Sequence, residues 1–139
     1  PSINRFSSDQ TLSNTANELV SNIRTVQNNS RNKVVCSPSN ASKAWWLMFN
    51  NSTSYRISAL CGDSTSNQYP PVNLPPDVTL SVCNNDFTNA NISWDNLRSE
   101  VKLRCGSFID SDFIVTLTNT KTSATRQVTV TKGGVIKLN

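Results

Sequence analysis

The sequence predicts an α+β protein in which an N-terminal amphipathic helix packs on one or more antiparallel β-sheets. Two observations carry this prediction. Apolar residues recur at helical spacing between residues 12 and 26. Beyond residue 33, short runs of alternating apolar and polar residues are separated by turn-forming residues, as in β-strands. One helix followed by a series of strands favours a helix that is packed across the sheet.

The helical stripe lies within residues 1–32, which we expect to form the helix and the polar segment that ends it. The apolar residues of the stripe fall on one face of a helix, and only that face requires burial. They are Leu12, Ala16, Leu19, Val20, Ile23 and Val26.

Two interpretations of the helix start remain open. Ser7 and Gln10 have the spacing of a capping box, and Asp9 is a competing N-cap, so the helix could begin near residue 8. Residues 1–6, which begin with a proline, precede that cap, and proline is tolerated in the first turn of a helix or at a kink. In the second interpretation they belong to a longer helix that continues before the first residue.

Residues 33–139 are predicted to form a β domain, so we expect a single domain that spans residues 1–139. About seven or eight strands are expected from the pattern. The candidate segments are 34–36, 44–49, 55–61, 78–83, 101–105, 113–117, 128–130 and 135–138, and residues 92–94 are either a short strand or a turn. The run from Trp45 to Phe49 suits a strand that is buried on both faces. Residues 62–77 contain four prolines and no periodicity, which predicts a long loop.

The four cysteines, Cys36, Cys61, Cys83 and Cys105, are widely spaced in a chain without histidine. Structural zinc sites usually draw their ligands from close pairs, so two disulfide bonds are the better interpretation. Disulfide bonds place the folded protein in an oxidising compartment, a periplasm or the cell exterior. Three pairings are possible, and the sequence does not decide among them. We favour Cys36 with Cys61 and Cys83 with Cys105, because each pair flanks a predicted hairpin or short excursion and closes a short loop.

The chain contains no run of about eighteen apolar residues, and it lacks the basic start and apolar stretch of a signal peptide. A protein with disulfide bonds must nevertheless be exported. We therefore expect that residues before Pro1 direct export and have been removed.

Catalysis is not expected from this sequence. Histidine, the usual proton carrier, is absent, and the serines lack a nucleophile-elbow or Ser-x-x-Lys setting. A hydrolase with a serine–lysine pair is the remaining enzymatic alternative. Asp110 with Asp112, or Asn84 with Asn85 and Asp86, could supply oxygen ligands for calcium, but neither stretch follows the EF-hand spacing. We expect no metal, no other cofactor and no small-molecule substrate.

The net charge of +4 raises the question of an anionic partner. The Lys and Arg residues are scattered along the chain, so a solvated surface explains most of them. Arg126, Lys132 and Lys137 are the best candidates for a DNA contact, because they could line one edge of the last strands. Three separated basic residues are few for a nucleic-acid binding surface.

Four stretches of the chain, taken in order, carry a family resemblance. They are a helix with a proline, an aromatic residue and an apolar stripe, a strand with a cysteine, a strand with a tryptophan, and a closing hairpin. These stretches comprise Pro1, Ser2, Ile3, Phe6, Leu12, Ala16, Leu19, Val20, Ile23 and Arg24; Val34, Val35, Cys36, Ser37 and Pro38; Trp46, Leu47, Met48 and Phe49; and Val128, Val130, Gly133, Gly134, Val135 and Ile136. Together they resemble type IV pilin-like proteins, most closely the GspH/FimT-type minor pseudopilins and minor pilins.

The resemblance implies that a prepilin peptidase cuts a short leader from the precursor and that an apolar half-helix precedes Pro1. That half-helix would anchor the protein in the inner membrane before it enters an extracellular or periplasmic filament. Other pilin or pseudopilin subunits would be its partners, in contact with Ile3, Phe6 and the apolar stripe of the helix. Some FimT-like proteins take part in DNA uptake through a C-terminal Gly-Arg-x-Arg motif, from which residues 134–137 (Gly-Val-Ile-Lys) depart.

Three functional hypotheses follow from these features. The leading one is a structural subunit of a type IV pilus or of a type II secretion pseudopilus. The second is a secreted adhesin or other binding module, which predicts a conventional signal peptide and a short, peripheral N-terminal helix. The third is a minor pilin that captures DNA for a competence filament, which predicts binding that weakens with salt.

Overall fold

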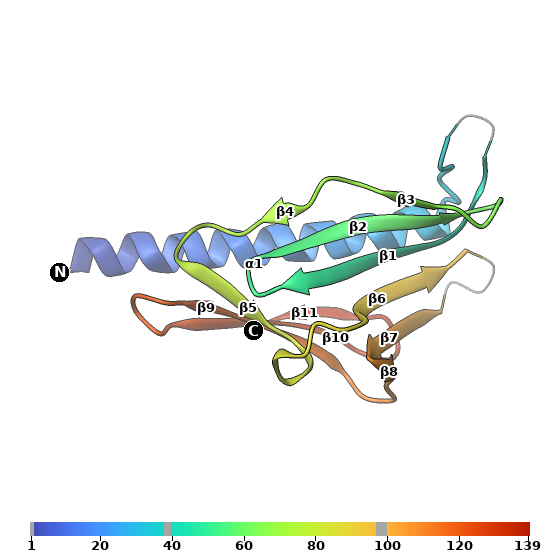
Figure 1. Ribbon diagram of the computed structural model, residues 1–139. Coiled ribbons are helices and arrows are strands. Elements are labelled where there is room, and N and C mark those ends of the chain that lie inside the picture. The colour runs from blue at the N-terminus through green and yellow to red at the C-terminus, as the bar shows by residue number, and fades with distance from the viewer. Residues whose placement is uncertain (1, 38–39, 97–99) are drawn as a thin grey trace.

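The computed structural model describes residues 2–37, 40–96 and 100–139, and it consists of one long helix followed by two antiparallel sheets (Figure 1). This arrangement confirms the α+β class. The helix is α1 (Ser2–Arg31), and a single 3-10 turn, η1 (Cys83–Asn85), follows β5. In the described residues the strands are β1 (Ser42–Asn51), β2 (Ser54–Cys61), β3 (Ser66–Gln68), β4 (Val72–Asn73), β5 (Val78–Ser81), β6 (Ala90–Asp95), β7 (Val101–Cys105), β8 (Ser107–Phe108), β9 (Phe113–Asn119), β10 (Thr125–Val130) and β11 (Ile136–Leu138).

The two sheets alternate along the chain. Within the described residues, the larger sheet has seven strands in the order β3-β2-β1-β6-β7-β8, with β4 also paired to β2. The smaller sheet has four strands in the order β11-β10-β9-β5. After β1 to β4 the chain enters the smaller sheet at β5, returns to the larger sheet for β6 to β8, and ends in the smaller one. The sheets are therefore tied together by three crossings of the chain.

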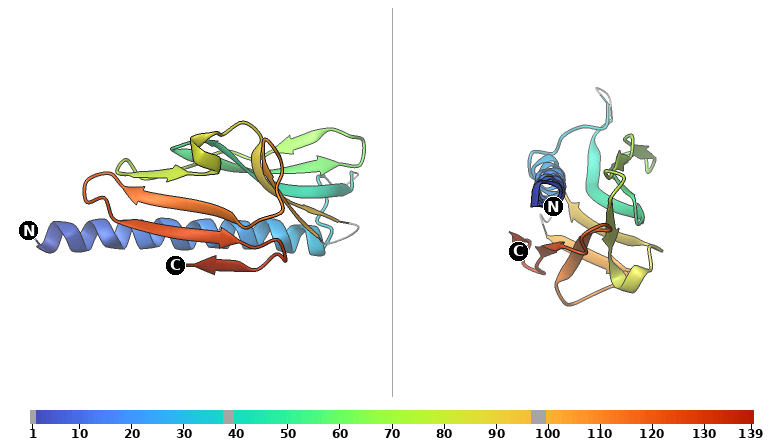
Figure 2. Two further views of the ribbon diagram at one scale, coloured as in Figure 1. Left: turned by 90° about the horizontal axis from the view of Figure 1, so that it is seen from below. Right: turned by 90° about the vertical axis from the view of Figure 1, so that its left-hand side faces the viewer.

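α1 packs against both sheets, with contacts to β1 and β6 of the larger sheet and to β9, β10 and β11 of the smaller one. Figure 2, which includes a view along the helix, shows α1 flanked by strands of both sheets. Its 30 residues make it about 45 Å long. The predicted apolar stripe is buried throughout: Leu12, Ala16, Leu19, Val20, Ile23 and Val26. The sequence pattern therefore identified the helix face that closes the core.

Aromatic side chains join the two sheets beneath the helix. The rings of Phe49 on β1 and Phe113 on β9 stack with their centroids 5.6 Å apart. Tyr55 on β2 lies beside Phe49, at 6.1 Å between centroids, and its hydroxyl accepts a hydrogen bond of 2.9 Å from Nδ2 of Asn22. The core thus contains contacts from each sheet to the other and from the larger sheet to α1.

The predicted helix start near residue 8 is wrong, because α1 already includes Ser2. The carbonyl oxygen of Ser7 accepts a hydrogen bond of 3.0 Å from the hydroxyl of Thr11, one turn later in the helix. Ser7 is therefore an interior helical residue and not a cap. The structure agrees with the interpretation in which the described residues before Ser7, from Ser2 to Phe6, belong to the same helix.

The predicted strand at residues 34–36 is also wrong, since the backbone there caps the helix. Lys33 has a φ of 52°, and the N–H groups of Lys33 and Val34 donate to the carbonyls of Ser30 and Asn29. This is the hydrogen-bond pattern of a Schellman motif, which satisfies the last carbonyls of a helix. Cys36 then donates from its N–H to the carbonyl of Asn40 in a local turn.

Two further expectations about the strands need correction. β1 is buried on one face only, at Trp45, Leu47 and Phe49, whereas Trp46 and Met48 are partly exposed. Residues 62–77 are not a plain loop, because β3 and β4 pair with β2 inside this segment. Edge strands of three and two residues are too short to show a periodic pattern.

The structure contains the two favoured disulfide bonds. Cys36–Cys61 connects the segment after α1 to the end of β2, and Cys83–Cys105 connects η1 to the end of β7. The second bond therefore joins the chain that leaves the smaller sheet to a strand of the larger one. With all four cysteines paired, no thiolate is left for zinc.

Candidate assembly surface

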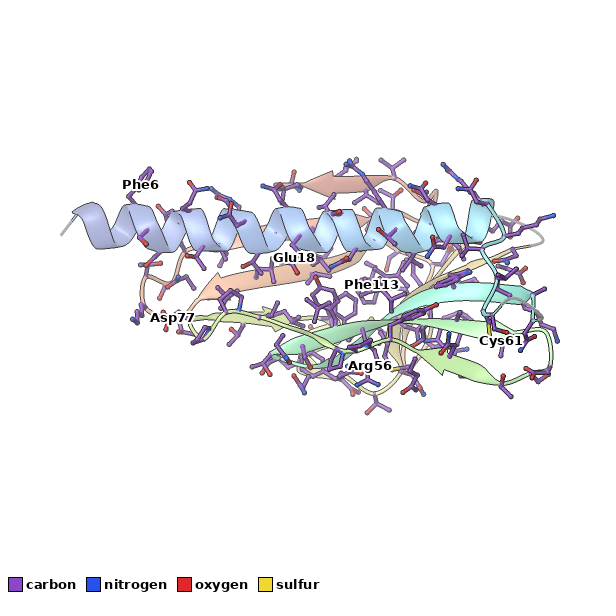
Figure 3. All side chains as sticks on the ribbon, turned by 90° about the horizontal axis from the view of Figure 1, so that it is seen from above. Phe6, Glu18, Arg56, Cys61, Asp77 and Phe113 are labelled. Atoms are coloured by element: carbon purple, nitrogen blue, oxygen red, sulfur yellow. A yellow bond between two sulfur atoms is a disulfide. The ribbon has the colours of Figure 1, made fainter. Side chains whose placement is uncertain are left out.

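The N-terminal end of α1 projects beyond the sheets, as Figures 1 and 2 show. Burial of the helix begins at Leu12, of which 1% is exposed. Phe6, which lies six residues earlier in the helix, is 71% exposed. In Figure 3 its ring lies on the side of α1 that faces away from the larger sheet. Ile3, the other apolar residue predicted for assembly, belongs to α1, and its side chain lies outside the described residues.

A hollow of about 470 Å³ lies beside this end of the helix. Its walls come from the first turns of α1, from the segment before β5 and from the end of β9, and consist of Ser7, Ser8, Thr11, Pro75, Pro76, Asp77, Asn119 and Lys121. Asp77 and Lys121 form an ion pair of 3.4 Å across the rim, and both side chains are exposed. Six of its eight lining residues are polar, so a neighbouring chain that entered it could form hydrogen bonds there.

The rest of the exposed helix surface is polar. After Phe6, the exposed residues of α1 are Ser7, Gln10, Asn14, Asn17, Glu18, Ser21, Arg24, Thr25, Asn28 and Arg31. All of these side chains are polar or charged. Among the helix residues with described side chains, Phe6 is therefore the one large apolar group available to a partner.

The helix is attached to the larger sheet by a hydrogen bond at Tyr55. Burial raises the pKa of the Tyr55 phenol to about 12, while the hydrogen bond from Asn22 acts in the opposite direction and the Glu18 carboxylate adds to the increase. The phenol is therefore neutral over the whole physiological range.

The three cations predicted for a DNA contact do not share one face. On the smaller sheet, Arg126 is paired with buried Leu117 and lies on the core side. Lys137 is in register, through β10, with exposed Ile114 and lies on the opposite side. Lys132 lies in the turn between β10 and β11. Strand register thus separates residues that lie close together in the sequence.

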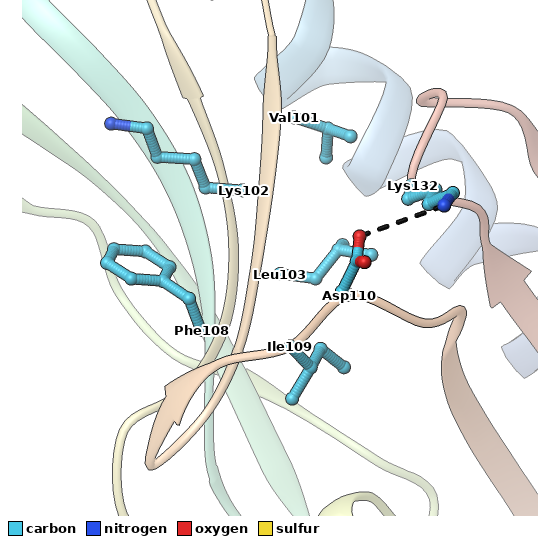
Figure 4. Close-up of a pocket in the computed structure, with 7 residues that line it drawn as sticks. All are labelled: Val101, Lys102, Leu103, Phe108, Ile109, Asp110 and Lys132. Carbon is cyan, nitrogen blue, oxygen red and sulfur yellow. Dashed lines mark ion pairs between the residues drawn. The ribbon is translucent and has the colours of Figure 1, made fainter.

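The side chain of Lys132 forms an ion pair with Asp110 at 3.8 Å, at the rim of a hollow of about 330 Å³ (Figure 4). Val101, Lys102, Leu103, Phe108 and Ile109 complete its lining. Asp110, one of the calcium candidates, is thus engaged with a cation.

The other calcium candidates lie elsewhere. Asn84, Asp86 and Asp112 line a hollow of about 660 Å³ next to the Cys83–Cys105 bond. One carboxylate oxygen of Asp86 accepts a hydrogen bond from the N–H of Thr88. In the described part of the chain, no group of three or more acidic or cysteine residues is placed to hold a metal ion.

Sequence reasoning about partners missed Arg56, Arg104 and Phe108. In the sequence, Lys102 and Arg104 alternate with Val101, Leu103 and Cys105, which indicates only that they lie on the solvent-facing side of a strand. The register of five strands was needed to show that they share a face with an exposed aromatic ring.

No protein-family model, curated protein or solved structure matches this chain. Among the described residues, no helix combines the length and the hydropathy needed to cross a lipid bilayer.

Proposed function

We propose that this protein is a structural subunit of a type IV pilus or of a type II secretion pseudopilus, which assembles through α1 and displays its two sheets. The proposal rests on the difference between the buried part of α1 and its projecting N-terminal end. One face of residues 12–30 is buried against both sheets, whereas the N-terminal end of α1 projects beyond them with Phe6 exposed. A helix that served only to close the core would end where the core ends.

A filament requires two different surfaces on one chain, because a head-to-tail contact that does not close into a ring repeats without limit. The projecting end of α1 offers one such surface, and the β domain offers others. Two disulfide bonds suit a subunit that works outside the cytoplasm. In this function the partners are other pilin or pseudopilin subunits, and an apolar half-helix before Pro1 holds the protein in the inner membrane until assembly.

The sequence of the full precursor is the first test. The proposal predicts a short leader for prepilin peptidase, followed by about twenty apolar residues that run directly into Pro1. A conventional signal peptide cleaved near Pro1 would overturn it and favour a secreted adhesin or binding module.

The second test follows the full-length protein in the cells that make it. We expect it in the fraction of surface or periplasmic filaments released by shearing, and we expect that loss of prepilin peptidase keeps it in the inner membrane. A full-length protein that stays soluble and never co-sediments with filaments would contradict the proposal.

A further inference from the structure

The outer face of the larger sheet, which faces away from α1, carries a row of side chains that includes two arginines, an amide and an exposed aromatic ring. On β7, Leu103 is buried in the core, so its neighbours Lys102 and Arg104 lie on the outer face. Residues that are paired between neighbouring strands lie on the same face of the sheet, so the strand register identifies the other residues of the outer face. The row contains Arg56 on β2, Met48 on β1, Asn91 on β6, Arg104 on β7 and Phe108 on β8.

An arginine and an aromatic ring form one end of this row. The guanidinium carbon of Arg104 lies 4.3 Å from the centroid of the Phe108 ring. This cation–π contact fixes the guanidinium plane at the surface. Phe108 is nevertheless 61% exposed, so most of its ring is open to a ligand. Figure 4 shows Lys102 and Phe108 on the same side of β7.

The cations of the row lack acidic partners in the described chain, where both ion pairs lie elsewhere, at Lys121 and Lys132. Arg56 donates from Nη1 to the side-chain oxygen of Gln68 at 2.8 Å. The Nε atoms of Arg56 and Arg104 are buried and have no acceptor. Among the described residues, neither guanidinium group is paired with a carboxylate, so both positive charges remain uncompensated at this face.

The spacing of the charges limits the kind of ligand. From β2 to β7 there are three strand-to-strand steps, so Arg56 and Arg104 are separated by roughly 14 Å. Asn91 and Ser93 lie on the outer face between them, together with partly exposed Trp46. The face thus offers separated cations with neutral amide and hydroxyl groups in between, and one carboxylate, that of Asp95, lies farther along β6 on the same face.

We propose that this face binds an acidic polysaccharide, a chain in which carboxylates are spaced by neutral sugars. The arginines would pair with carboxylates, the amides and hydroxyls with sugar hydroxyls, and the open side of Phe108 with the apolar face of a sugar ring. Single-stranded nucleic acid fits this face less well, because it carries a charge on every nucleotide and is usually held by several stacked aromatic side chains. The proposal does not depend on filament assembly.

The test is calorimetric titration of the protein with hyaluronate oligosaccharides of defined length, with neutral dextran and oligothymidylate in parallel. We expect saturable binding to hyaluronate, none to dextran, and weaker binding to oligothymidylate. Arg104→Ala and Lys102→Ala are each expected to weaken hyaluronate binding about tenfold. Phe108→Ala should also weaken it.

Arg126→Ala and Lys137→Ala are the matched controls, since both remove one exposed positive charge from the smaller sheet. They should leave hyaluronate binding within about twofold of the unmodified protein. Lys102 is exposed, so its substitution keeps the fold, which circular dichroism checks. Absence of hyaluronate binding, equal losses in the control variants, or tighter binding of oligothymidylate would each overturn the proposal.

Discussion

The two ends of α1 form one continuous helix but have different surroundings. From Leu12 to Ser30 the helix buries one face against both sheets and is attached to β2 through Asn22 and Tyr55. Before Leu12 none of the described helix side chains is fully buried, and the N-terminal end projects beyond the sheets with Phe6 exposed. The difference shows that burial stabilises only the second part. The first part is free to contact a partner, and changes in the two parts should have separable effects.

The largest expected effect on stability comes from a substitution in the buried part of α1. Ile23 has no exposed surface, so Ile23→Ala leaves a cavity between α1 and the sheets. We expect the free energy of unfolding to fall by about 3 to 4 kcal/mol, as measured by urea denaturation. Thr25→Ala, on the exposed side of the same turn, is the control and should change it by less than about 0.5 kcal/mol. Equal effects at both positions would remove the distinction between the two faces of the helix.

The next effect concerns the attachment of the helix's C-terminal end. Cys36–Cys61 closes a loop with a sequence separation of 25 residues. Replacing both cysteines with alanine should lower the free energy of unfolding by about 3 kcal/mol, because the unfolded chain gains freedom. Hydrogen exchange should rise in the last turns of α1 more than near Leu12. A loss below about 1 kcal/mol, or uniform exchange along the helix, would show that the disulfide does not secure this end.

Tyr55 makes the helix–sheet contact sensitive to alkaline pH. Its pKa is about 12 in the folded protein against 10.0 ordinarily, so the folded state retains the phenolic proton where the unfolded chain loses it. Stability from this group is fully present below pH 10 and declines as the pH rises to about 12, by about 2 to 3 kcal/mol. Urea denaturation across this range measures the decline. In Tyr55→Phe most of it should disappear, and an unchanged decline would assign it to other groups.

The smallest effect on stability is expected at the projecting end. Because Phe6 is 71% exposed and lies beyond the sheets, Phe6→Ala should change the free energy of unfolding by less than about 0.5 kcal/mol. The same change in the full-length protein should reduce its incorporation into filaments. Phe108→Ala is the matched control, since it also removes an exposed ring but from the β domain. A loss of stability in Phe6→Ala without a loss of incorporation would reverse the roles given to the two ends.

Much of the fold could be predicted because it depends on local periodicity. The stripe from Leu12 to Val26 and the alternation in β5, β7, β9 and β10 are patterns that a single strand or helix displays by itself. The predictions were wrong where one short sequence pattern is compatible with two local structures. Ser7 and Gln10 have cap spacing but lie inside a helix, and Val34 is β-branched but completes a helix cap.

The candidate surfaces were harder to predict, because they depend on register between strands. Arg126 and Lys137 are close in the sequence, yet the pairing of β10 and β11 places them on opposite faces. Arg56 and Arg104 are far apart in the sequence, yet three strand pairings place them in one row. The charge of each residue is evident in the sequence, but the face that it occupies is not.

Photo-crosslinking from the projecting helix is the most direct test of the two roles of α1. The photoreactive analogue benzoylphenylalanine is placed at Phe6 or, as control, at Phe108 in the full-length protein, and cells that produce filaments are irradiated. Our account predicts adducts between subunits from position 6 in filaments and few from position 108. Filaments that contain the protein but give no adduct from position 6, or equal adducts from both positions, would contradict the claim that the projecting end of α1 is the assembly surface.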